Sequence, residues 1–319
     1  MPARVLYGDL SKYGHVTLAL GRQGSAPADF DRFACDSLAQ LEDGLAAFLH
    51  RQDAPDLDAA AFSACGWERA GGLSMPNHHF SISRDWLKDV LRIKRLHLVN
   101  DCVAMAMSVE TGAAGDLSEI HAAEGDGQAV KALIATGIGL GTAAILPEED
   151  GRHIVLPCEG GHSTLAVAGD EEIALAALLR ERFGHLSREC AISQTGLVAL
   201  YTALGQVHGG GETAMEVDEV VRRARTGDAM AMRAIHILAG WLAAMASDVA
   251  LMLGARGGIY LSGVLLEQIG DLIDRPAFSA RYTDKGRLSD YVSTIPVYHF
   301  TLREQMIRGL GTLFERDHH

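Results

Sequence analysis

Apolar and polar positions in the first hundred residues form short apolar runs separated by amphipathic stretches. Two apolar runs, at residues 5–7 and 16–20, flank a short polar turn and predict two strands joined tightly. Over residues 30–49 apolar side chains recur at nearly helical spacing, which predicts one amphipathic helix. Ser83 precedes a second amphipathic stretch, as a helix cap would. Further strands are expected at residues 60–65 and in RLHLVND.

The remaining chain carries a second set of elements. The stretch AVKALIATGIGLGTAAIL predicts strand, glycine turn and strand. Asp170 is expected to cap the next helix and Gly184 to end it, and a long helical region is expected to reach Leu253. Other predictions are a helix in SQTGLVALYTAL, a loop from His208, a strand, turn and helix start in GGIYLSGVLLEQ, a strand in IPVYHF and a helix in EQMIRGLGTLFER. Both halves open with strand, turn and strand, which predicts two α/β lobes with a cleft between them.

Composition limits the partners of the chain. It has 319 residues, 48% of them hydrophobic, and a net charge of −13, which argues against nucleic acid or an anionic membrane as the main partner. The five cysteines include no CxxC pair and no secretory leader is seen, so a cytoplasmic location is expected. The most apolar stretch, residues 235–254, contains His236 and Asp248, and a buried helix is expected there rather than a membrane span.

Candidate chemistry begins at HLVNDCVAMAM, where Asn100 and Asp101 fall between a predicted strand and a predicted helix. Side chains at that position point into the crevice where α/β proteins bind ligands. The helix N-terminus is expected to favour the ionised carboxylate of Asp101, as a base for a sugar hydroxyl requires. The alternative is that Asn100 or Asp101 only caps the helix.

Two glycine-rich stretches add further candidates. In LPCEGGHSTLAV, a sharp turn at Gly160-Gly161 would bring Glu159 and His162 to one ligand, although a solvated surface turn has the same pattern. In ATGIGLGTAAIL the spacing is GxGxG, and the stretch ends at a proline where a dinucleotide motif needs a helix. A glycine hairpin over phosphates is therefore favoured over a nicotinamide site. Its glycines are Gly137, Gly139 and Gly141.

Together and in order, these stretches resemble the bacterial glucokinases of the hexokinase–actin–Hsp70 ATPase superfamily. The resemblance runs from Leu96 to Thr312 and is looser before it, where Gly8-Asp9 and Asn77 match. The matching stretches are VNDCVAMAM, GIGLGTA, LPCEGGH, ALLRERFGHLSRE, GLVALY, GGIYLSG, DKGRLSDYV and IPVYHF.

The resemblance implies two RNase-H-like (actin-like ATPase) lobes, a small one over residues 1–110 plus 301–319 and a large one over 111–300. It implies a glucokinase that uses ATP and Mg²⁺, with a homodimer as a further expectation. Asp101 falls on the catalytic base, which takes the proton of the glucose 6-hydroxyl. The sugar-binding positions of the family fall on Asn100, Asp101, Glu159, His162 and Glu189.

The nucleotide side departs from the family pattern. Its implied residues are Gly8, Asp9, Ser11, Lys12, Gly137, Gly139, Gly141 and Gly263, with Asp9 ordering Mg²⁺ through water. Ser11-Lys12-Tyr13 replace Gly-Gly-Thr in the first phosphate turn. Ile138 replaces a threonine in the second turn, Val264 replaces a glycine in the adenosine turn, and Gln194-Thr195 replace Gly-Pro near the adenine.

Three readings follow from this asymmetry between an intact sugar side and a divergent nucleotide side. The leading one is ATP-dependent phosphorylation of glucose, with Lys12 standing in for the lost backbone donors. The second is a glucose-binding pseudokinase that acts as a sensor or regulator. The third keeps the kinase and changes the phosphoryl donor. In the first reading the ligands are glucose and ATP, with neither nucleic acid nor membrane as a partner.

Overall fold

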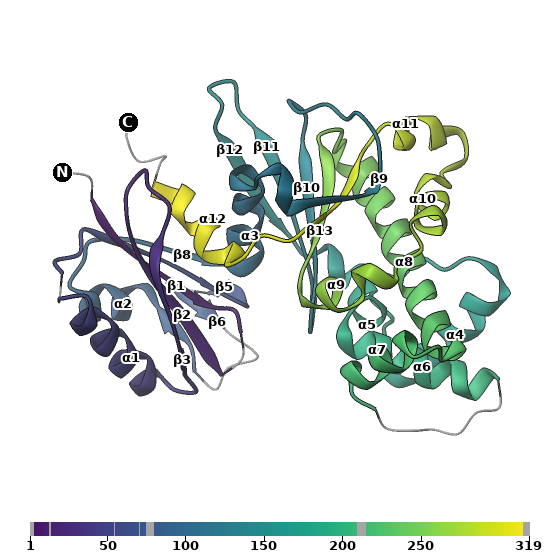
Figure 1. Ribbon diagram of the computed structural model, residues 1–319, viewed down its shortest axis with the longest axis horizontal. Coiled ribbons are helices and arrows are strands. Elements are labelled where there is room, and N and C mark those ends of the chain that lie inside the picture. The colour runs from purple at the N-terminus through teal and green to yellow at the C-terminus, as the bar shows by residue number, and fades with distance from the viewer. Residues whose placement is uncertain are drawn as a thin grey trace. The chain divides into compact units, whose positions relative to one another are not determined.

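The computed structural model describes residues 3–12, 14–53, 55–69, 71–74, 80–208 and 215–314 (Figure 1). The chain divides into two compact units, one formed by Met1–Gly112 with Leu302–His319 and the other by Ala113–Thr301. The final helix therefore belongs to the same unit as the N-terminal sheet.

The first unit is built on a five-stranded sheet with the strand order β3-β2-β1-β4-β8. Strands β1, β4 and β8 run parallel, whereas β2 and β3 are antiparallel additions. These strands are β1 (Arg4–Leu10), β2 (His15–Arg22), β3 (Ala28–Ala34), β4 (Ala59–Ala64) and β8 (Arg95–Asn100). A smaller sheet consists of β5 (Trp67–Arg69), β6 (Gly72–Ser74) and β7 (Ile82–Ser83).

Helices cover both faces of the five-stranded sheet, because alternate strand residues point to opposite sides. Leu6 and Phe62 share a buried cluster with Leu41 of α1 (Leu38–Arg51) and Leu87 of α2 (Arg84–Leu91). On the other face Tyr7 packs edge-on against Phe314, with ring centroids 6.4 Å apart, beside α12 (Gln305–Leu313), which packs against α3 (Asp101–Ser108).

The helix predicted over residues 30–49 is wrong in its first part. Residues 28–34 form β3, which pairs antiparallel with β2 and places Phe33 opposite Val16. The helix α1 begins only at Leu38, where the Ser37 side chain accepts a hydrogen bond from the Gln40 amide. Spacing alone misleads here, because Phe30 and Phe33 happen to continue the helical pattern of the following residues. The cap at Ser83 is confirmed, since its hydroxyl accepts from the Trp86 amide.

The second unit is built on a six-stranded sheet with the order β12-β11-β10-β13-β14-β9. Strands β10, β13 and β14 are parallel, and β10 and β11 form the expected hairpin. The strands are β9 (Leu117–His121), β10 (Lys131–Thr136), β11 (Leu140–Pro147), β12 (His153–Cys158), β13 (Gly258–Ser262) and β14 (Val297–Phe300). Without its outer strand β9, this sheet has the same topological order as that of the first unit.

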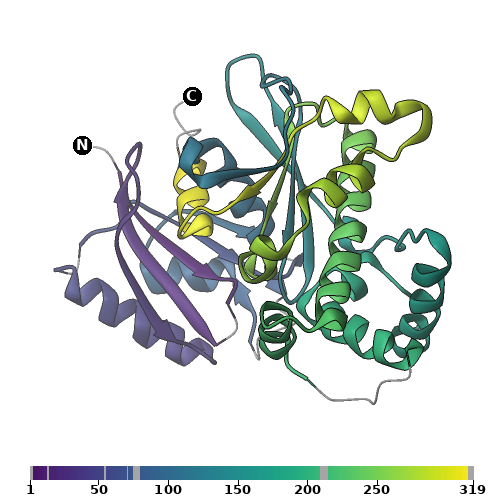
Figure 2. The ribbon, with the colours of Figure 1, turned by 45° about the vertical axis from the view of Figure 1, so that its right-hand side comes forward.

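In the second unit, α6 (Gln194–Val207), α7 (Val217–Arg225) and α10 (Arg275–Thr283) pack against α8 (Ala229–Leu253), a long and largely buried helix (Figure 2). It is the one described helix whose length and hydropathy meet the criteria for a membrane span, and 72% of its most apolar window is buried inside the protein, as in a core helix. The other α-helices described in this unit are α4 (Gly169–Phe183), α5 (Arg188–Ala191), α9 (Val264–Ile269) and α11 (Ser289–Ser293).

One predicted cap in this unit is wrong. Asp170 lies inside the first turn of α4. The N-cap residue is Ala168, which makes no capping hydrogen bond with its side chain. Glu172 takes part of that role, because its carboxylate accepts a hydrogen bond from the Ala168 amide. The end at Gly184 is confirmed, with a φ of 74° that glycine adopts without strain. The loop predicted from His208 lies mostly outside the described residues.

Candidate functional site

The carboxyl ends of β1, β4 and β8 bring polar side chains from three parts of the first unit together. Asp9, near the end of β1, is only 4% exposed. Its Oδ1 accepts hydrogen bonds from the Ser63 hydroxyl of β4 at 3.1 Å and from the Ser11 amide at 2.9 Å. Parallel strands place these ends at one edge of the sheet, which is where open α/β sheets bind ligands.

Asn100 and Asp101 lie at the junction of β8 and α3, at the same edge of the sheet. Asn100 is the N-cap of α3: its Oδ1 accepts from the Cys102 amide at 2.8 Å, and its Nδ2 donates to the Gly66 carbonyl at 2.7 Å. Asp101 Oδ1 also accepts from the Cys102 amide, at 2.9 Å. Because Asn100 serves as the cap, helix capping does not by itself account for the carboxylate at Asp101.

The electrostatics of Asp101 differ from the expectation at the helix N-terminus. Burial and the neighbouring charge of Asp9 raise the pKa of Asp101 to about 6, against hydrogen bonds from backbone amides and the Cys65 thiol that lower it. The helix end is outweighed because desolvation and a like charge both penalise the ionised form. Burial likewise raises the pKa of Asp9, although Ser11, Ser63 and Lys12 oppose that shift. A carboxyl with a pKa near 6 suits a general base at neutral pH.

The hairpin between β1 and β2 is polar and closes on a glycine. The His15 amide donates to the Lys12 carbonyl at 3.2 Å, and Gly14 takes the left-handed position with a φ of 70°. Lys12 is exposed, while Tyr13 and the looser match at Asn77 lie outside the described residues. Gly8 lies within β1, where a side chain would run into the Phe62 ring. Packing therefore explains why position 8 has no side chain.

In the second unit, the start of β11 gathers the predicted sugar residues. Glu189, on α5, accepts a hydrogen bond from the Leu140 amide at 3.1 Å. The short turn Gly160–His162 presses against the same residue, since a side chain on Gly161 would meet the Leu140 carbonyl. This turn holds Glu159 and His162, whose carboxylate and imidazole lie 3.9 Å apart with side chains 81% and 61% exposed. The three side chains thus belong to one surface region that a polar ligand can reach.

The turn predicted to be the second phosphate turn lies at the carboxyl ends of β10 and β13. Gly137 donates to the Gly139 carbonyl at 2.8 Å, and the Gln194 amide donates to the Gly137 carbonyl at 2.8 Å. Gly263, with a φ of 106°, packs so closely on the Thr136 backbone that no side chain fits there. Gly141 instead lies within β11, paired with Ala135. Ile138 and Val264 are 59% and 44% exposed at this turn, so two aliphatic side chains border it.

Sequence reasoning missed several partners of these residues. Ser63 follows an apolar run near the end of a buried strand. A single polar residue in that position was the sequence signal that could have identified it as a site residue. Thr142 was missed as well: its hydroxyl donates to the Cys158 carbonyl at 2.9 Å and accepts from the Gly160 amide at 3.0 Å, which holds the turn Gly160–His162, the predicted sugar turn. Across the described ranges, no group of three or more His, Cys, Asp and Glu side chains is arranged to hold a metal ion.

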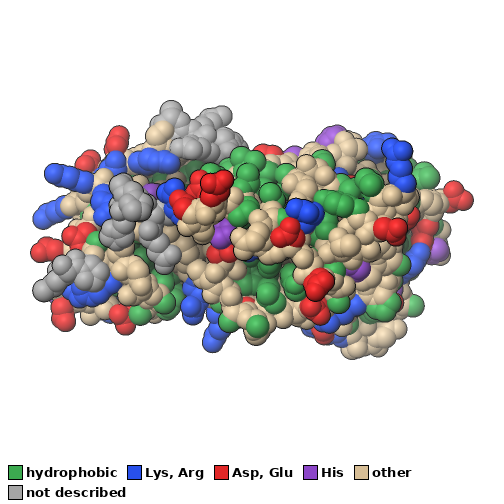
Figure 3. Space-filling model, turned by 90° about the horizontal axis from the view of Figure 1, so that it is seen from above, with side chains coloured by type: hydrophobic (Ala, Val, Ile, Leu, Met, Phe, Trp, Pro, Cys, Tyr) green, Lys and Arg blue, Asp and Glu red, His purple; other side chains and the backbone are tan. Residues whose placement is uncertain are grey.

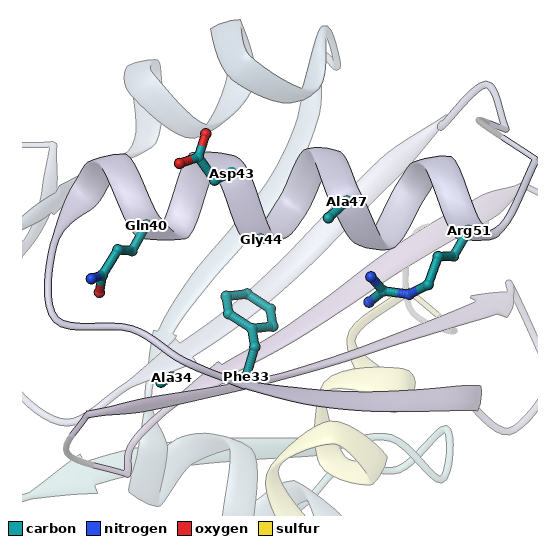
Figure 4. Close-up of a pocket in the computed structure, with 7 residues that line it drawn as sticks. All are labelled: Phe33, Ala34, Gln40, Asp43, Gly44, Ala47 and Arg51. Carbon is teal, nitrogen blue, oxygen red and sulfur yellow. The ribbon is translucent and has the colours of Figure 1, made fainter.

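A cavity of about 350 Å³ lies elsewhere, between β3 and α1 (Figure 4). Phe33, Gly44 and Ala47 are among the residues that line it, and the Phe33 ring packs directly on Gly44, where a side chain would collide with the ring. Arg51 at its rim is paired with Asp31. None of the predicted sugar or nucleotide residues lines this cavity.

Comparison with known proteins points in one direction. The family model described as Glucokinase matches residues 14–317. A glucokinase-like protein of Caulobacter vibrioides is 36% identical over 94% of this chain and 93% of its own length. A glucokinase of Aromatoleum aromaticum is 33% identical over 97% of this chain and 94% of its own.

Solved structures show the same fold. A glucokinase from an Antarctic psychrotroph superimposes with a TM-score of 0.87 at 23% identity, covering 98% of this chain and 99% of its own. A glucokinase of the ROK family from Streptomyces griseus, in complex with glucose and AMPPNP, gives a TM-score of 0.65 at 18% identity, covering 97% and 98% of the two chains. The two-lobed actin-like ATPase fold predicted from the sequence is confirmed.

Proposed function

This chain belongs to the glucokinase family, and from that premise we propose that it transfers the γ-phosphoryl group of ATP to the 6-hydroxyl of glucose with Asp101 as the base. The observation that carries the role of Asp101 is its place at the edge of the sheet, beside Asp9, with a pKa raised to about 6. Most of this carboxyl is ionised at neutral pH, and it still accepts a proton readily.

In the proposed reaction, an Asp101 carboxylate oxygen takes the proton of the glucose 6-hydroxyl. The hydroxyl oxygen forms a bond to the γ-phosphorus as the bond between that phosphorus and the β,γ-bridging oxygen breaks, and ADP leaves. Asn100, Glu159, His162 and Glu189 hold the sugar hydroxyls, which fixes the 6-hydroxyl before transfer. Positioning of this kind supplies most of the catalysis in phosphoryl transfer.

On the nucleotide side, the two hairpin turns would bind the phosphates and the turn at Gly263 the adenosine. Lys12 supplies a cation and Ser11 a hydroxyl at the first turn, while Gly137 and Gly139 let the backbone approach at the second. Asp9 would hold Mg²⁺ through water, and a buried carboxylate flanked by a second one fits a divalent cation. Bound Mg²⁺ neutralises charge on the phosphates.

A second candidate function is a glucose-binding pseudokinase. The observation in its favour is the exposed pair Ile138 and Val264, which replaces hydroxyl and backbone surface at the phosphate and adenosine turns with aliphatic groups. Aliphatic side chains offer phosphate no hydrogen bond, so this pair favours weak nucleotide binding. A kinase with another phosphoryl donor is the remaining variant of the proposal.

One experiment separates these functions. Formation of glucose 6-phosphate is followed in a coupled assay with ATP and Mg²⁺, then with other donors, while glucose binding is measured by calorimetry. Turnover with ATP supports the glucokinase, and glucose binding without turnover supports the pseudokinase. If the protein neither binds nor phosphorylates glucose, both candidate functions are wrong.

The proposal extends to partners and location. Glucose and ATP are small ligands, and on the face in Figure 3 acidic side chains lie among the basic ones, which does not favour a nucleic acid. A cytoplasmic location follows from these substrates. A homodimer is tested by light scattering on the purified protein.

A further inference from the structure

Glu189 lies on a very short helix. It belongs to α5, a helix of only four residues, which is too short to be stable by its own hydrogen bonds. What holds α5 in place therefore also determines where the Glu189 carboxylate lies. The side chain of the preceding residue, Arg188, points away from solvent and is 9% exposed.

Arg188 is tied to the central helix of the second unit. Its Nη2 donates to Asp248 Oδ2 at 2.8 Å, and Asp248 lies in α8, the long buried helix. Lys285 donates to the other oxygen of the same carboxylate, Oδ1, at 2.6 Å. The Lys285 and Asp248 side chains are 19% and 26% exposed. One carboxylate thus pairs with two cations that come from distant parts of the chain.

Two further contacts connect this cluster to the sugar residues. The Arg188 amide donates to the Ser163 carbonyl at 2.8 Å, immediately after the turn that carries His162. Glu189 itself accepts from the Leu140 amide. A displacement of α5 would therefore move Glu189 and disturb the neighbouring sugar turn together.

We propose that Asp248 is a positioning residue for glucose binding, which acts through Arg188 on Glu189. The inference rests on the proposed function, because Glu189 is a sugar ligand only there. Without the charge of Asp248, Arg188 and Lys285 become two poorly solvated cations that share one neutral partner. Arg188 then loses the attraction that ties α5 to α8 and is repelled by Lys285, since removing one partner of a buried ion pair leaves uncompensated charge.

The test measures the glucose Kd by calorimetry on the full chain. Asp248→Asn keeps the shape and removes the charge, and it is expected to weaken glucose binding about tenfold while kcat and the KM for ATP stay within about twofold, as loss of uniform substrate binding predicts. Lys285→Met in the Asp248→Asn protein removes the repulsion and should restore part of the affinity. In a Glu189→Ala protein, Asp248→Asn should cost clearly less than the roughly tenfold loss expected with Glu189 present, because part of its effect acts through Glu189 and only the rest through the neighbouring turn.

The matched control is Glu171→Gln. Glu171 also joins a helix to α8, through its ion pair with Arg233, but α4 carries no predicted sugar residue. It should leave the glucose Kd unchanged. If Asp248→Asn does not fold, Arg188→Met tests the same connection, because Asp248 and Lys285 remain paired; it too should weaken binding about tenfold by removing the tether.

Two results would overturn the proposal. One is a glucose Kd within twofold of the parent in whichever of these variants folds. The other is that the substitution weakens glucose binding by the same factor in the parent and in the Glu189→Ala protein. That result would mean a general structural effect. Failure of the parent to bind glucose is a different result, and it contradicts the proposed function instead.

Discussion

The two units share a strand order but present opposite chemistry where ligands are expected. In the first unit, Asp9 is buried at a strand end and Asp101 lies at the adjoining strand–helix junction, held by backbone and hydroxyl hydrogen bonds. In the second unit, Glu159 and His162 lie on a loop turn with their side chains mostly exposed. A reacting carboxylate benefits from fixed geometry and a shifted pKa, whereas groups that recognise a sugar must first be reachable from solvent.

The two hairpins differ in the same way. The one between β1 and β2 has a lysine at its tip and a buried carboxylate beside it. The one between β10 and β11 has the glycines 137 and 139 with an exposed isoleucine between them. A common sheet topology therefore positions two turns without deciding what either turn binds. That depends on a few side chains at the carboxyl ends of the strands.

The largest effect is expected from Asp101→Asn, which removes the base and keeps the shape. Turnover should fall about 10²–10⁴-fold, the usual contribution of a general base, while the glucose Kd changes by less than about tenfold. Steady-state kinetics and calorimetry on the same preparation give both numbers. A variant with nearly parental kcat would exclude Asp101 as the base.

Next in size are Glu159→Ala and His162→Ala in the second unit. Each removes a hydrogen-bond partner of the sugar and should weaken glucose binding by about 1.5–3 kcal/mol if the group is charged in the complex. Calorimetric titration with glucose measures this directly. If both variants bind glucose as well as the parent does, the recognition surface lies elsewhere.

The pH dependence follows from the raised pKa of Asp101. The base must be ionised, so kcat/KM should rise with pH up to about 6 and fall about tenfold for each unit below that value. Rate profiles at saturating ATP from pH 4.5 to 8 would show it, with thermal unfolding at each pH as a control for stability. An inflection near 4, the ordinary range of Asp, would mean that burial and Asp9 do not act on the base as inferred.

The smallest effects are expected at the two hairpins. Replacing Ser11-Lys12-Tyr13 by Gly-Gly-Thr, with one residue removed nearby, should raise kcat/KM for ATP several-fold, because backbone amides then approach the phosphates more closely. Ile138→Thr restores a hydroxyl at the other hairpin and should act in the same direction. If the graft lowers activity and Lys12→Ala lowers it too, the native turn is a phosphate site built on lysine.

Local features of this protein were readable from its sequence. The Ser83 cap, the hairpin of β10 and β11 and the junction that carries Asn100 and Asp101 depend on periodicity, turn residues and capping side chains close together in the chain. The strand at residues 28–34 was not readable in this way, because its pairing with β2 overrides a spacing that also suits a helix.

Only the tertiary structure decided the electrostatics and the long-range contacts. Asp9 and Asp101 are 92 positions apart, and burial together with the charge of Asp9 raises the pKa of Asp101, against the shift that the helix end alone predicts. Asp248 shows the same dependence, since Arg188 and Lys285 meet on it from 60 and 37 positions away. Desolvation and charge pairing depend on which segments the fold packs together, and a local pattern of residues contains no measure of either.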